Sequence, residues 1–301
     1  MAVIALKIDV DTYRGTREGT LRLAELLERL ALPATFLFSL GPDHTGRAIR
    51  RAFRRGFFSK VRRTSVLAHY GLRTLLYGVL LPGPHIGRRC RGPMQEIARR
   101  GFEVGVHTWD HVRWQDGVAR ASEAWTRREL TLARDEFMAV FGQAPRVHGA
   151  AGWQMNPYVP ALQHELGFRY ASDTRGSGPF LPRLAQGTAA VPQLPTTLPT
   201  LDELIGRNDL AGTDPVDHLL ALTARAPARD QVFTLHAELE GGRLLGAFER
   251  LLRGWQERGA HLTDLGGYAA TLDLRGLPRC AIVDGTVAGR SGTLALQGPP
   301  D

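Results

Sequence analysis

The stretch VIALKIDVD, residues 3–11, decides the fold, because it is apolar almost throughout and ends in two carboxylates. Such a continuous apolar run is typical of a parallel strand that is buried on both faces. Further strand-like runs follow at 34–39, 102–107, 146–150, 168–173, 231–236 and 260–263, and helical patterns separate most of them. Alternation of strands and helices predicts an α/β protein with a parallel sheet. With about seven such units and no dinucleotide-binding fingerprint, we predict a closed barrel rather than an open doubly wound sheet.

The overall composition is that of a globular protein. The chain has 301 residues, of which 43% are hydrophobic and 23% are charged, and this excludes a disordered, collagen-like or fibrous protein. Cys90 and Cys280 are too few for a disulfide framework and indicate a reducing compartment. The first residues lack the basic and apolar regions of an export signal, and no apolar run is long enough to span a bilayer.

The positive charge is concentrated in one segment. The net charge is +8, and the stretch between His44 and Gln95 holds twelve basic residues but no Asp or Glu. Apolar residues lie among them, notably at 75–81. Basic and apolar residues together favour binding at an anionic membrane surface, and we assign this role to residues 47–81. A solvated basic helix packed on the domain is the alternative, and a nucleic-acid-binding role lacks a recognisable module.

Polar residues stand at the ends of the predicted strands. They are Asp9, Asp11, His107, His111, Asp173 and His236. In a barrel the carboxyl ends of all strands open on one face, where active sites are built. The His-x3-His spacing of His107 and His111 suits one metal ion, and Asp9 and Asp11 share a face of their strand. One Asp and two His are typical of a catalytic metal site, and they leave the second Asp free to act as a general base.

These motifs, in this order, resemble those of the polysaccharide deacetylase (NodB-like) family. The motifs are IDVDT at 8–12, HTWDH at 107–111, Asp173 and LHAE at 235–238. The resemblance implies a distorted (β/α) barrel and a metal-dependent amide hydrolase. It assigns Asp9 as the base, Asp11, His107 and His111 as ligands of a divalent metal, His236 as the acid, and Asp173 as the residue that orients or tunes His236. The metal is expected to be Zn²⁺, with Co²⁺, Mn²⁺ or Ni²⁺ as alternatives.

One family feature is missing. The third motif of the family supplies an arginine near the base, whereas this chain has HGAAGW at 148–153. The sequence therefore does not identify the residue that holds Asp9.

Longer runs are similar to one subgroup of the family. They lie at 9–19, 151–153, 172–176, 198–207 and 236–241. The subgroup removes the N-formyl group from an undecaprenyl-phosphate-linked 4-formamido-arabinose at the cytoplasmic face of the bacterial inner membrane. Its product serves the modification of lipid A with aminoarabinose, which gives polymyxin resistance. The resemblance implies this lipid-linked aminosugar as the substrate and a peripheral membrane location. The sequence gives no sign of a protein partner, and we expect no nucleic-acid partner.

Other residues are candidates for substrate binding. Arg14, Arg17 and Arg175 suit a phosphate group, although surface or structural ion pairs are equally common uses of arginine. Trp153 is a candidate for the sugar site, and Glu238 would share a strand face with His236. We expect residues 1–274 to form the barrel, with an insertion at 44–92, and residues 275–301 to form an irregular C-terminal extension.

Two other functions remain open at this point. One is a deacetylase of N-acetylated polysaccharide or peptidoglycan, which would normally be exported. The other is a non-enzymatic protein that binds membrane or nucleic acid through the basic segment. Metal content and the identity of the released acid distinguish the three hypotheses.

Overall fold

The computed structural model describes residues 2–48, 72–185, 188–224 and 229–300. The strands are β1 (Val3–Val10), β2 (Thr35–Ser39), β3 (Glu103–Thr108), β4 (Val147–His148), β5 (Tyr170–Ala171), β6 (Leu181–Pro182), β7 (Gln231–His236), β8 (His261–Thr263), β9 (Arg279–Gly285) and β10 (Leu294–Pro300). The α-helices are α1 (Thr20–Arg29), α5 (Leu72–Leu76), α6 (Ile86–Arg89), α7 (Arg91–Arg99), α8 (His111–Gly117), α9 (Glu123–Phe141), α10 (Val159–Glu165), α11 (Leu201–Leu204), α12 (Pro215–Thr223), α13 (Leu245–Glu257) and α14 (Leu265–Ala270). Short η helices occupy Gly15–Gly19 (η1), Val118–Arg120 (η2), Ala151–Trp153 (η3) and Asn208–Leu210 (η4).

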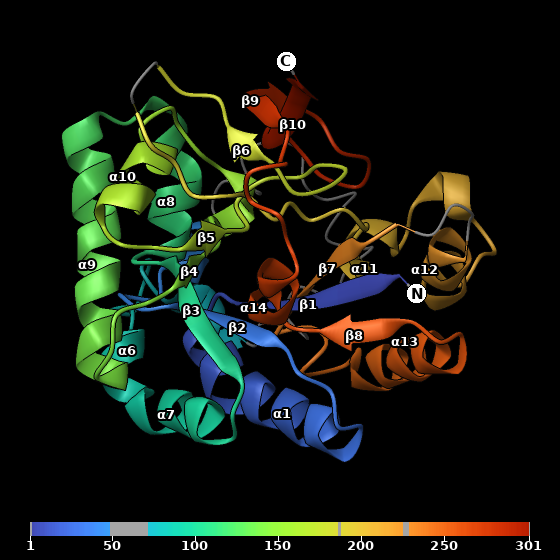
Figure 1. The fold of residues 1–301 in the computed structure, drawn as a ribbon. Helices are drawn as coiled ribbons and strands as arrows, with labels where there is room; N and C mark the ends of the chain where they lie inside the picture. Colours follow the sequence, from blue (N-terminus) through green and yellow to red (C-terminus); the bar gives the residue numbers. More distant parts are fainter. Residues whose placement is uncertain (1, 49–71, 186–187, 225–228, 301) are drawn as a thin grey trace.

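Seven parallel strands form one curled sheet (Figure 1). The hydrogen-bonded order is β5-β4-β3-β2-β1-β7, and β8 pairs with the first residues of β1. The prediction of a distorted (β/α) barrel with about seven units is confirmed. No β5–β7 strand pairing is present among the described residues, so the sheet is a curled half-barrel rather than a regular closed barrel.

An irregular segment bridges the gap between the two edge strands. Beside β5, Ala171 N donates a hydrogen bond to Pro192 O, and Leu194 N donates one to Ala171 O. A few residues later, Thr197 N donates to Val232 O of β7. Residues 192–197 therefore span the opening that two regularly paired strands would otherwise close.

The two faces of β1 have different roles. The side chains of Ile4, Leu6, Ile8 and Val10 are buried in the same core cluster as the buried residues of α1. That helix buries Leu23, Leu26 and Leu27, which lie on one side of it because their spacing is three and four residues. The alternate residues of β1 face the inside of the curled sheet, as the two-residue period of a strand requires. The inward face therefore carries Lys7 and Asp9, which are both buried.

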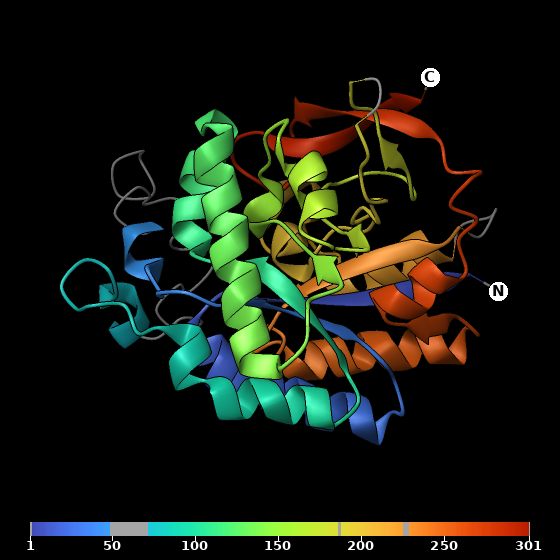
Figure 2. The same cartoon turned by 60° about the vertical axis from the view of Figure 1, so that its left-hand side comes forward.

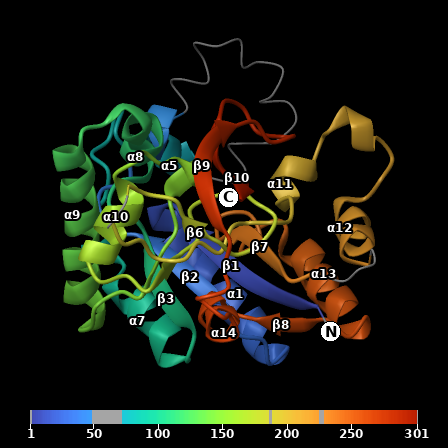
Figure 3. The ribbon, with the colours of Figure 1, turned by 45° about the horizontal axis from the view of Figure 1, so that its top comes forward.

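The C-terminal residues form a β-hairpin instead of the expected irregular extension. Strands β9 and β10 pair antiparallel, and β9 also pairs with β6 in parallel. The hairpin lies on the opposite side of the main sheet from α1 and α13 (Figures 1 and 2). Helices α8–α10 lie to one side of it and α11–α12 to the other (Figure 3). Backbone hydrogen bonds from Arg175 N to Ala295 O and from Gln297 N to Arg175 O attach β10 to the segment after β5.

The basic segment is described only in part. Residues 49–71, which hold most of its arginines, lie outside the described residues. In the described part, Arg47 and Arg73 are exposed, as are Val79, Leu80 and Leu81. None of the helices in the described ranges is both long and apolar enough to cross a membrane.

Candidate active site

Asp11, His107 and His111 converge at the carboxyl end of the sheet. Asp11 follows β1, His107 belongs to β3, and His111 is the first residue of α8, whose N-terminus is capped by the Asp110 side chain. The Nε2 atoms of His107 and His111 lie 3.2 and 3.4 Å from Asp11 Oδ1. One potential ligand atom from each residue lies within 4.8 Å of the other two. The structure thus brings together the three residues expected to hold a metal.

The hydrogen bonds around these residues fit a bound cation. His107 Nδ1 lies 2.6 Å from Gly149 O, and a carbonyl only accepts, so Nδ1 carries the proton and Nε2 is left with its lone pair. Asp11 Oδ1 is buried and has no hydrogen-bond partner among the described residues. A buried carboxylate oxygen without a partner is costly unless a cation lies near it. Two imidazole nitrogens and one carboxylate oxygen are suitable ligands for a divalent ion such as Zn²⁺.

The charges of this cluster are strongly coupled. Burial raises the pKa of Asp11, but the neighbouring His111 and His107 outweigh burial and hold that pKa well below its ordinary value. Burial lowers the pKa of His111, which favours the neutral, metal-binding imidazole. For His107, burial is outweighed by Asp9 and Asp11, and its pKa is raised. An ionised Asp11 beside a neutral His111 is a suitable environment for a cation bound between them.

Asp9 lies next to the metal-binding cluster and is held by a lysine. Its Oδ2 is 3.3 Å from Lys7 Nζ, and the Lys7 side chain is completely buried. Lys7 Nζ also donates a hydrogen bond to Ser172 O at 2.9 Å. Asp9 Oδ1 has no hydrogen-bond partner among the described residues. Asp9 is thus a fixed carboxylate with one open oxygen, as a general base requires.

Lys7 contacts Asp9 in this chain, which lacks the arginine that the family has near the base. A Cβ added at Gly149 would lie 2.4 Å from Leu37 Cδ1 and 3.1 Å from Lys7 Cε, so these two side chains together fill the space beside Gly149. Lys7 was not among the site residues predicted from the sequence. A signal was present, because a lysine in an apolar strand two residues before Asp9 must share its face.

His236 lies at the end of β7, in register with Asp9 on β1. Its Nδ1 is 3.7 Å from Asp202 Oδ1 in α11. The other oxygen of Asp202 lies 3.3 Å from Arg290 Nη2, which comes from the loop between β9 and β10. Burial raises the pKa of Asp202, but Arg290 and His236 outweigh burial and lower it. Asp202 is therefore an ionised partner of His236, and the sequence analysis assigned no role to Asp202 or Arg290.

Asp173 does not contact His236, contrary to the expectation that it orients that residue. The carboxylate is fully buried, and its Oδ1 accepts from His148 Nδ1 at 2.7 Å and from Ala150 N at 2.8 Å. Its Oδ2 accepts from the side-chain amides of Gln163 and Gln193, both at 2.8 Å. Four donors occupy both oxygens. Asp173 therefore joins the segments after β4 and β5 and is not placed to tune the acid.

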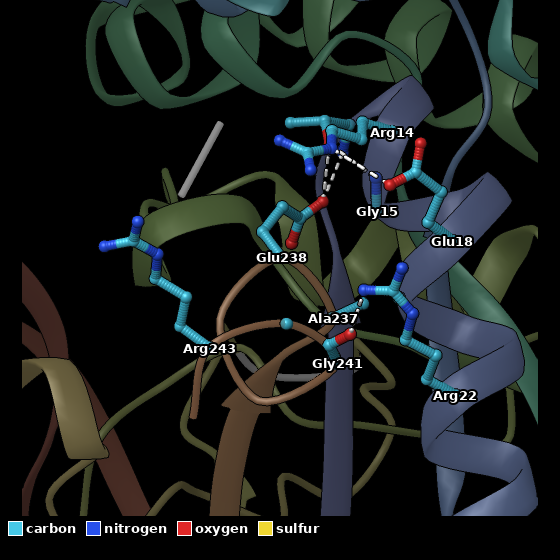
Figure 4. Close-up of a pocket in the computed structure, with 11 residues that line it drawn as sticks. Arg14, Gly15, Glu18, Arg22, Ala237, Glu238, Gly241 and Arg243 are labelled. Carbon is cyan, nitrogen blue, oxygen red and sulfur yellow. Dashed lines mark hydrogen bonds and ion pairs between the residues drawn. The ribbon is translucent and has the colours of Figure 1, made fainter. Parts of the chain in front are cut away.

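Two of the predicted substrate-binding residues, Arg14 and Glu238, line a cavity of about 440 Å³ (Figure 4). Glu238 Oε1 accepts from Asp11 N at 3.1 Å, from Thr12 N at 2.8 Å and from Thr12 Oγ1 at 2.8 Å. Burial raises the pKa of Glu238 well above its ordinary value, and the charge of Asp11 acts in the same direction. Glu238 thus holds the segment after β1 against the segment after β7.

The other predicted substrate-binding residues are occupied by protein contacts. The guanidinium of Arg17 lies over the Tyr13 ring at 5.3 Å. Arg175 is buried and pairs with Glu203 at 2.5 Å. Trp153 is buried too, and the guanidinium groups of Arg175 and Arg290 lie over its ring at 5.0 and 4.7 Å. These contacts favour a structural role for Arg175 and Trp153.

The fold and the site define the class of protein: a hydrolase acting on amides, built on a curled (β/α) half-barrel. The model of the polysaccharide deacetylase family matches residues 2–171, and the chain belongs to this family. This result confirms the resemblance on which the sequence-based site rested.

Two curated relatives extend the similarity along most of the chain. A protein of Shewanella sediminis (strain HAW-EB3), named probable 4-deoxy-4-formamido-L-arabinose-phosphoundecaprenol deformylase ArnD, is 35% identical over 83% of this chain and 80% of its own length. A protein of the same name from Wigglesworthia glossinidia brevipalpis is 30% identical over 94% of this chain and 98% of its own length.

Solved structures share the fold. A crystal structure described as a polysaccharide deacetylase from Mycobacterium smegmatis covers 95% of both chains with a TM-score of 0.64 and 20% identity. That of a probable polysaccharide deacetylase from Pseudomonas aeruginosa PAO1 covers 89% of this chain and 90% of its own, with a TM-score of 0.58 and 14% identity.

Proposed function

We propose that the protein removes the N-formyl group from undecaprenyl-phosphate 4-deoxy-4-formamido-L-arabinose and releases formate and the free amine. The observation that carries this proposal is the convergence of Asp11, His107 and His111 beside Asp9 and His236. The choice of substrate is supported by the two relatives named ArnD, which match most of the chain at 30–35% identity.

The residues divide the work of amide hydrolysis between them. Asp11, His107 and His111 would hold a divalent cation, with Zn²⁺ preferred and Co²⁺, Mn²⁺ or Ni²⁺ as alternatives. When bound, the cation supplies Lewis-acid polarisation of the formyl oxygen and lowers the pKa of water. Asp9 removes a proton from the water that attacks the formyl carbon. His236 donates a proton to the sugar nitrogen as the C–N bond breaks.

The proposed base and the proposed acid each have a charged neighbour. Lys7 fixes the Asp9 carboxylate from the side away from the open Oδ1. Asp202 Oδ1 lies 3.7 Å from Nδ1 of His236, and the other oxygen of Asp202 pairs with Arg290. The acid is important because an amide nitrogen is a poor leaving group, and loss of such an acid costs on the order of 10²–10⁴ in rate.

The proposal includes a peripheral position on the cytoplasmic face of the inner membrane. There the insertion at 44–92, and within it residues 47–81, would contact anionic lipid. In its described part, exposed Leu80 stands beside exposed Val79 and Leu81, and Arg47 and Arg73 supply positive charge. Vesicles with anionic lipid should bind the protein, more weakly at high salt. Binding that survives deletion of residues 47–81 would disprove this part of the proposal. The product would serve lipid A modification and polymyxin resistance.

The decisive experiment incubates metal-loaded protein with the formylated lipid-linked sugar and measures released formate. The matched control is Asp9→Asn, which keeps the side-chain size and is expected to retain the metal but lose activity. The same assay with the N-acetylated sugar measures acetate. Release of acetate in preference to formate would make the protein a deacetylase, and release of neither would disprove the proposed activity.

A further inference from the structure

The cavity of about 440 Å³ beside the active site has no role in the amide chemistry described above. Two segments line it, and each follows a strand that carries an active-site residue (Figure 4). The first runs from Thr12 to Arg22, after β1, and the second from Ala237 to Arg243, after β7. The cavity is therefore built by the same strand ends that place Asp11 and His236.

Three arginines line this cavity. Arg14 and Arg22 project from the first segment and Arg243 from the second, so that guanidinium groups stand on different sides of the space (Figure 4). Glu18 and Glu238 are the carboxylates of the lining, and Glu18 pairs with Arg14 at 3.1 Å. Arg22 Nη1 lies 3.5 Å from Gly241 O, a distance at which a hydrogen bond is weak. Three guanidinium groups around one cavity favour an anion with several oxygens, such as a phosphate.

Glycines hold the two segments in direct contact. A Cβ at Gly15 would lie 1.9 Å from Glu238 Oε1, and one at Gly19 would lie 2.0 Å from Ala237 O. A Cβ at Gly241 would lie 2.4 Å from the same carbonyl oxygen. At Gly19 and Gly241 the clash would be with backbone, so these glycines allow the two segments that carry the arginines to pack directly against each other. The cavity is thus a built feature of the fold rather than a gap between loose side chains.

The cavity adjoins the metal-binding cluster through one contact. Thr12 and Glu238 belong to its lining, and Glu238 Oε1 accepts from the backbone N–H of Asp11 at 3.1 Å. A ligand in the cavity is therefore separated from the Asp11 carboxylate by the backbone of 11–12 and its Glu238 partner. In the proposed substrate, the formamido group and the phosphate stand at opposite positions of one sugar ring. A ring that places its amide at the cluster would have its phosphate about one ring width away, and the cavity adjoins the cluster at this contact.

We infer that this cavity binds the phosphodiester of the lipid-linked sugar through Arg14, Arg22 and Arg243. The inference rests on the proposed function and identifies where the phosphate is held. It replaces Arg17 and Arg175 as phosphate ligands, because Arg17 stacks on Tyr13 and Arg175 is buried against Glu203. Arg14, named from the sequence, remains in the set.

The kinetic test compares two water-soluble substrates that differ only in the phosphate. One is the methyl phosphodiester of 4-deoxy-4-formamido-arabinose and the other is its methyl glycoside. Arg22→Gln and Arg243→Gln are each expected to raise KM for the phosphodiester about tenfold, since each removes a charge-assisted hydrogen bond. KM for the glycoside and kcat for both substrates should stay unchanged. Arg29→Gln is the matched control, because Arg29 is an exposed arginine of the same helix α1 outside the cavity.

The outcomes separate this inference from the proposed function. An unchanged KM for the phosphodiester in both variants would overturn the inference and leave the deformylase activity intact. An equal rise in KM for both substrates would overturn it as well, because the arginines would then act through the structure. Rescue of the phosphodiester KM by Arg22→Lys, which keeps the charge, would support it.

A binding experiment tests the phosphate site independently of hydrolysis. If neither substrate is hydrolysed, only the proposed function is disproved. Calorimetry with methyl arabinosyl phosphate should show binding to wild type and about tenfold weaker binding to Arg22→Gln and Arg243→Gln. Methyl arabinoside without phosphate should bind equally weakly to all of them. Inorganic phosphate that binds as tightly as the phosphodiester would assign the cavity to free phosphate and overturn the lipid-linked assignment.

Discussion

Two clusters of histidine and aspartate lie at the carboxyl ends of neighbouring strands, and they differ in their hydrogen bonding and burial. In the Asp11 cluster, formed by Asp11, His107 and His111, Oδ1 of the aspartate has no hydrogen-bond partner among the described residues. In the Asp173 cluster, formed by Asp173 with His148 and two glutamines, four donors occupy both aspartate oxygens. The residue types are alike, but the Asp173 cluster is fully buried, whereas Asp11 and His111 are partly exposed. The open oxygen and the two imidazoles directed at it distinguish a metal centre from a structural network.

The largest expected effect comes from removing a ligand of the Asp11 cluster. His107→Ala deletes one of two imidazole ligands, and we expect metal content to fall to background. Formate release should fall roughly 10³-fold or more, because the cation is expected to supply several kcal/mol of transition-state stabilisation. The measurements are elemental analysis of the purified protein and the formate assay, and chelator treatment of wild type should reproduce the loss. His261→Ala, at an exposed histidine, is the control. Normal metal content in His107→Ala would refute the assignment.

The same experiment on the Asp173 cluster should give the opposite pattern. Asp173→Ala leaves buried donors of His148, Gln163 and Gln193 without an acceptor, and we expect a loss of about 3–5 kcal/mol in the free energy of unfolding. Metal content per folded molecule should stay at the wild-type level. Urea denaturation and elemental analysis together check this prediction. A variant that is as stable as wild type but lacks metal would show that the distinction between the clusters is wrong.

Lys7 lies between the two clusters: its Nζ contacts Asp9, which is next to the Asp11 cluster, and the carbonyl of Ser172, the residue before Asp173. Lys7→Met removes the cation but keeps a long apolar side chain. We expect kcat to fall on the order of 10²-fold with little change in KM, because the base loses its position while the substrate contacts remain. Lys7→Arg should recover most of kcat. Loss of stability without a selective fall in kcat, or no recovery with arginine, would make Lys7 a structural residue only.

The sequence predicted what depends on local pattern. Apolar runs located the main strands, and their carboxyl ends located Asp11, His107 and His111 on one rim. The ends of the strands predict which residues lie at the carboxyl edge of the sheet. They do not predict which of these residues contact each other. Asp173 was therefore assigned to the wrong partner, and Asp202 was not considered.

Residues from segments without a periodic pattern were missed for a related reason. Arg290 comes from the loop of a hairpin whose Gly- and Pro-containing sequence indicated an irregular extension. Its contact with Asp202 exists only after β9 and β10 fold over the sheet. The cavity arginines Arg22 and Arg243 are far apart in sequence and line one cavity only because β1 and β7 are neighbours.

Glu240 provides a third case and the smallest expected effect. Its Oε2 accepts from His236 N at 2.8 Å, while its buried Oε1 has no partner in the described part of the chain. Burial raises the pKa of Glu240 to about 7, and the charge of His236 only partly offsets this. Burial thus favours a proton on this open carboxylate, where the Asp11 cluster would hold a metal.

The sign of the pH dependence follows from that raised pKa. The folded protein binds a proton at Glu240 that the unfolded chain releases near pH 4.5, so this group lowers the free energy of unfolding as pH rises from about 4.5 to 7. Glu240→Gln removes the cost of burying the charge and keeps an oxygen for His236 N. The variant should be more stable than wild type by roughly 3 kcal/mol at pH 8 and equal to it near pH 4. Urea denaturation at both values checks this, and the other titrating groups cancel because the two proteins share them. If the difference in free energy of unfolding between the two proteins does not depend on pH, Glu240 stays ionised in the folded protein. A buried carboxylate oxygen without a partner would then not be enough to distinguish a proton site from a metal site.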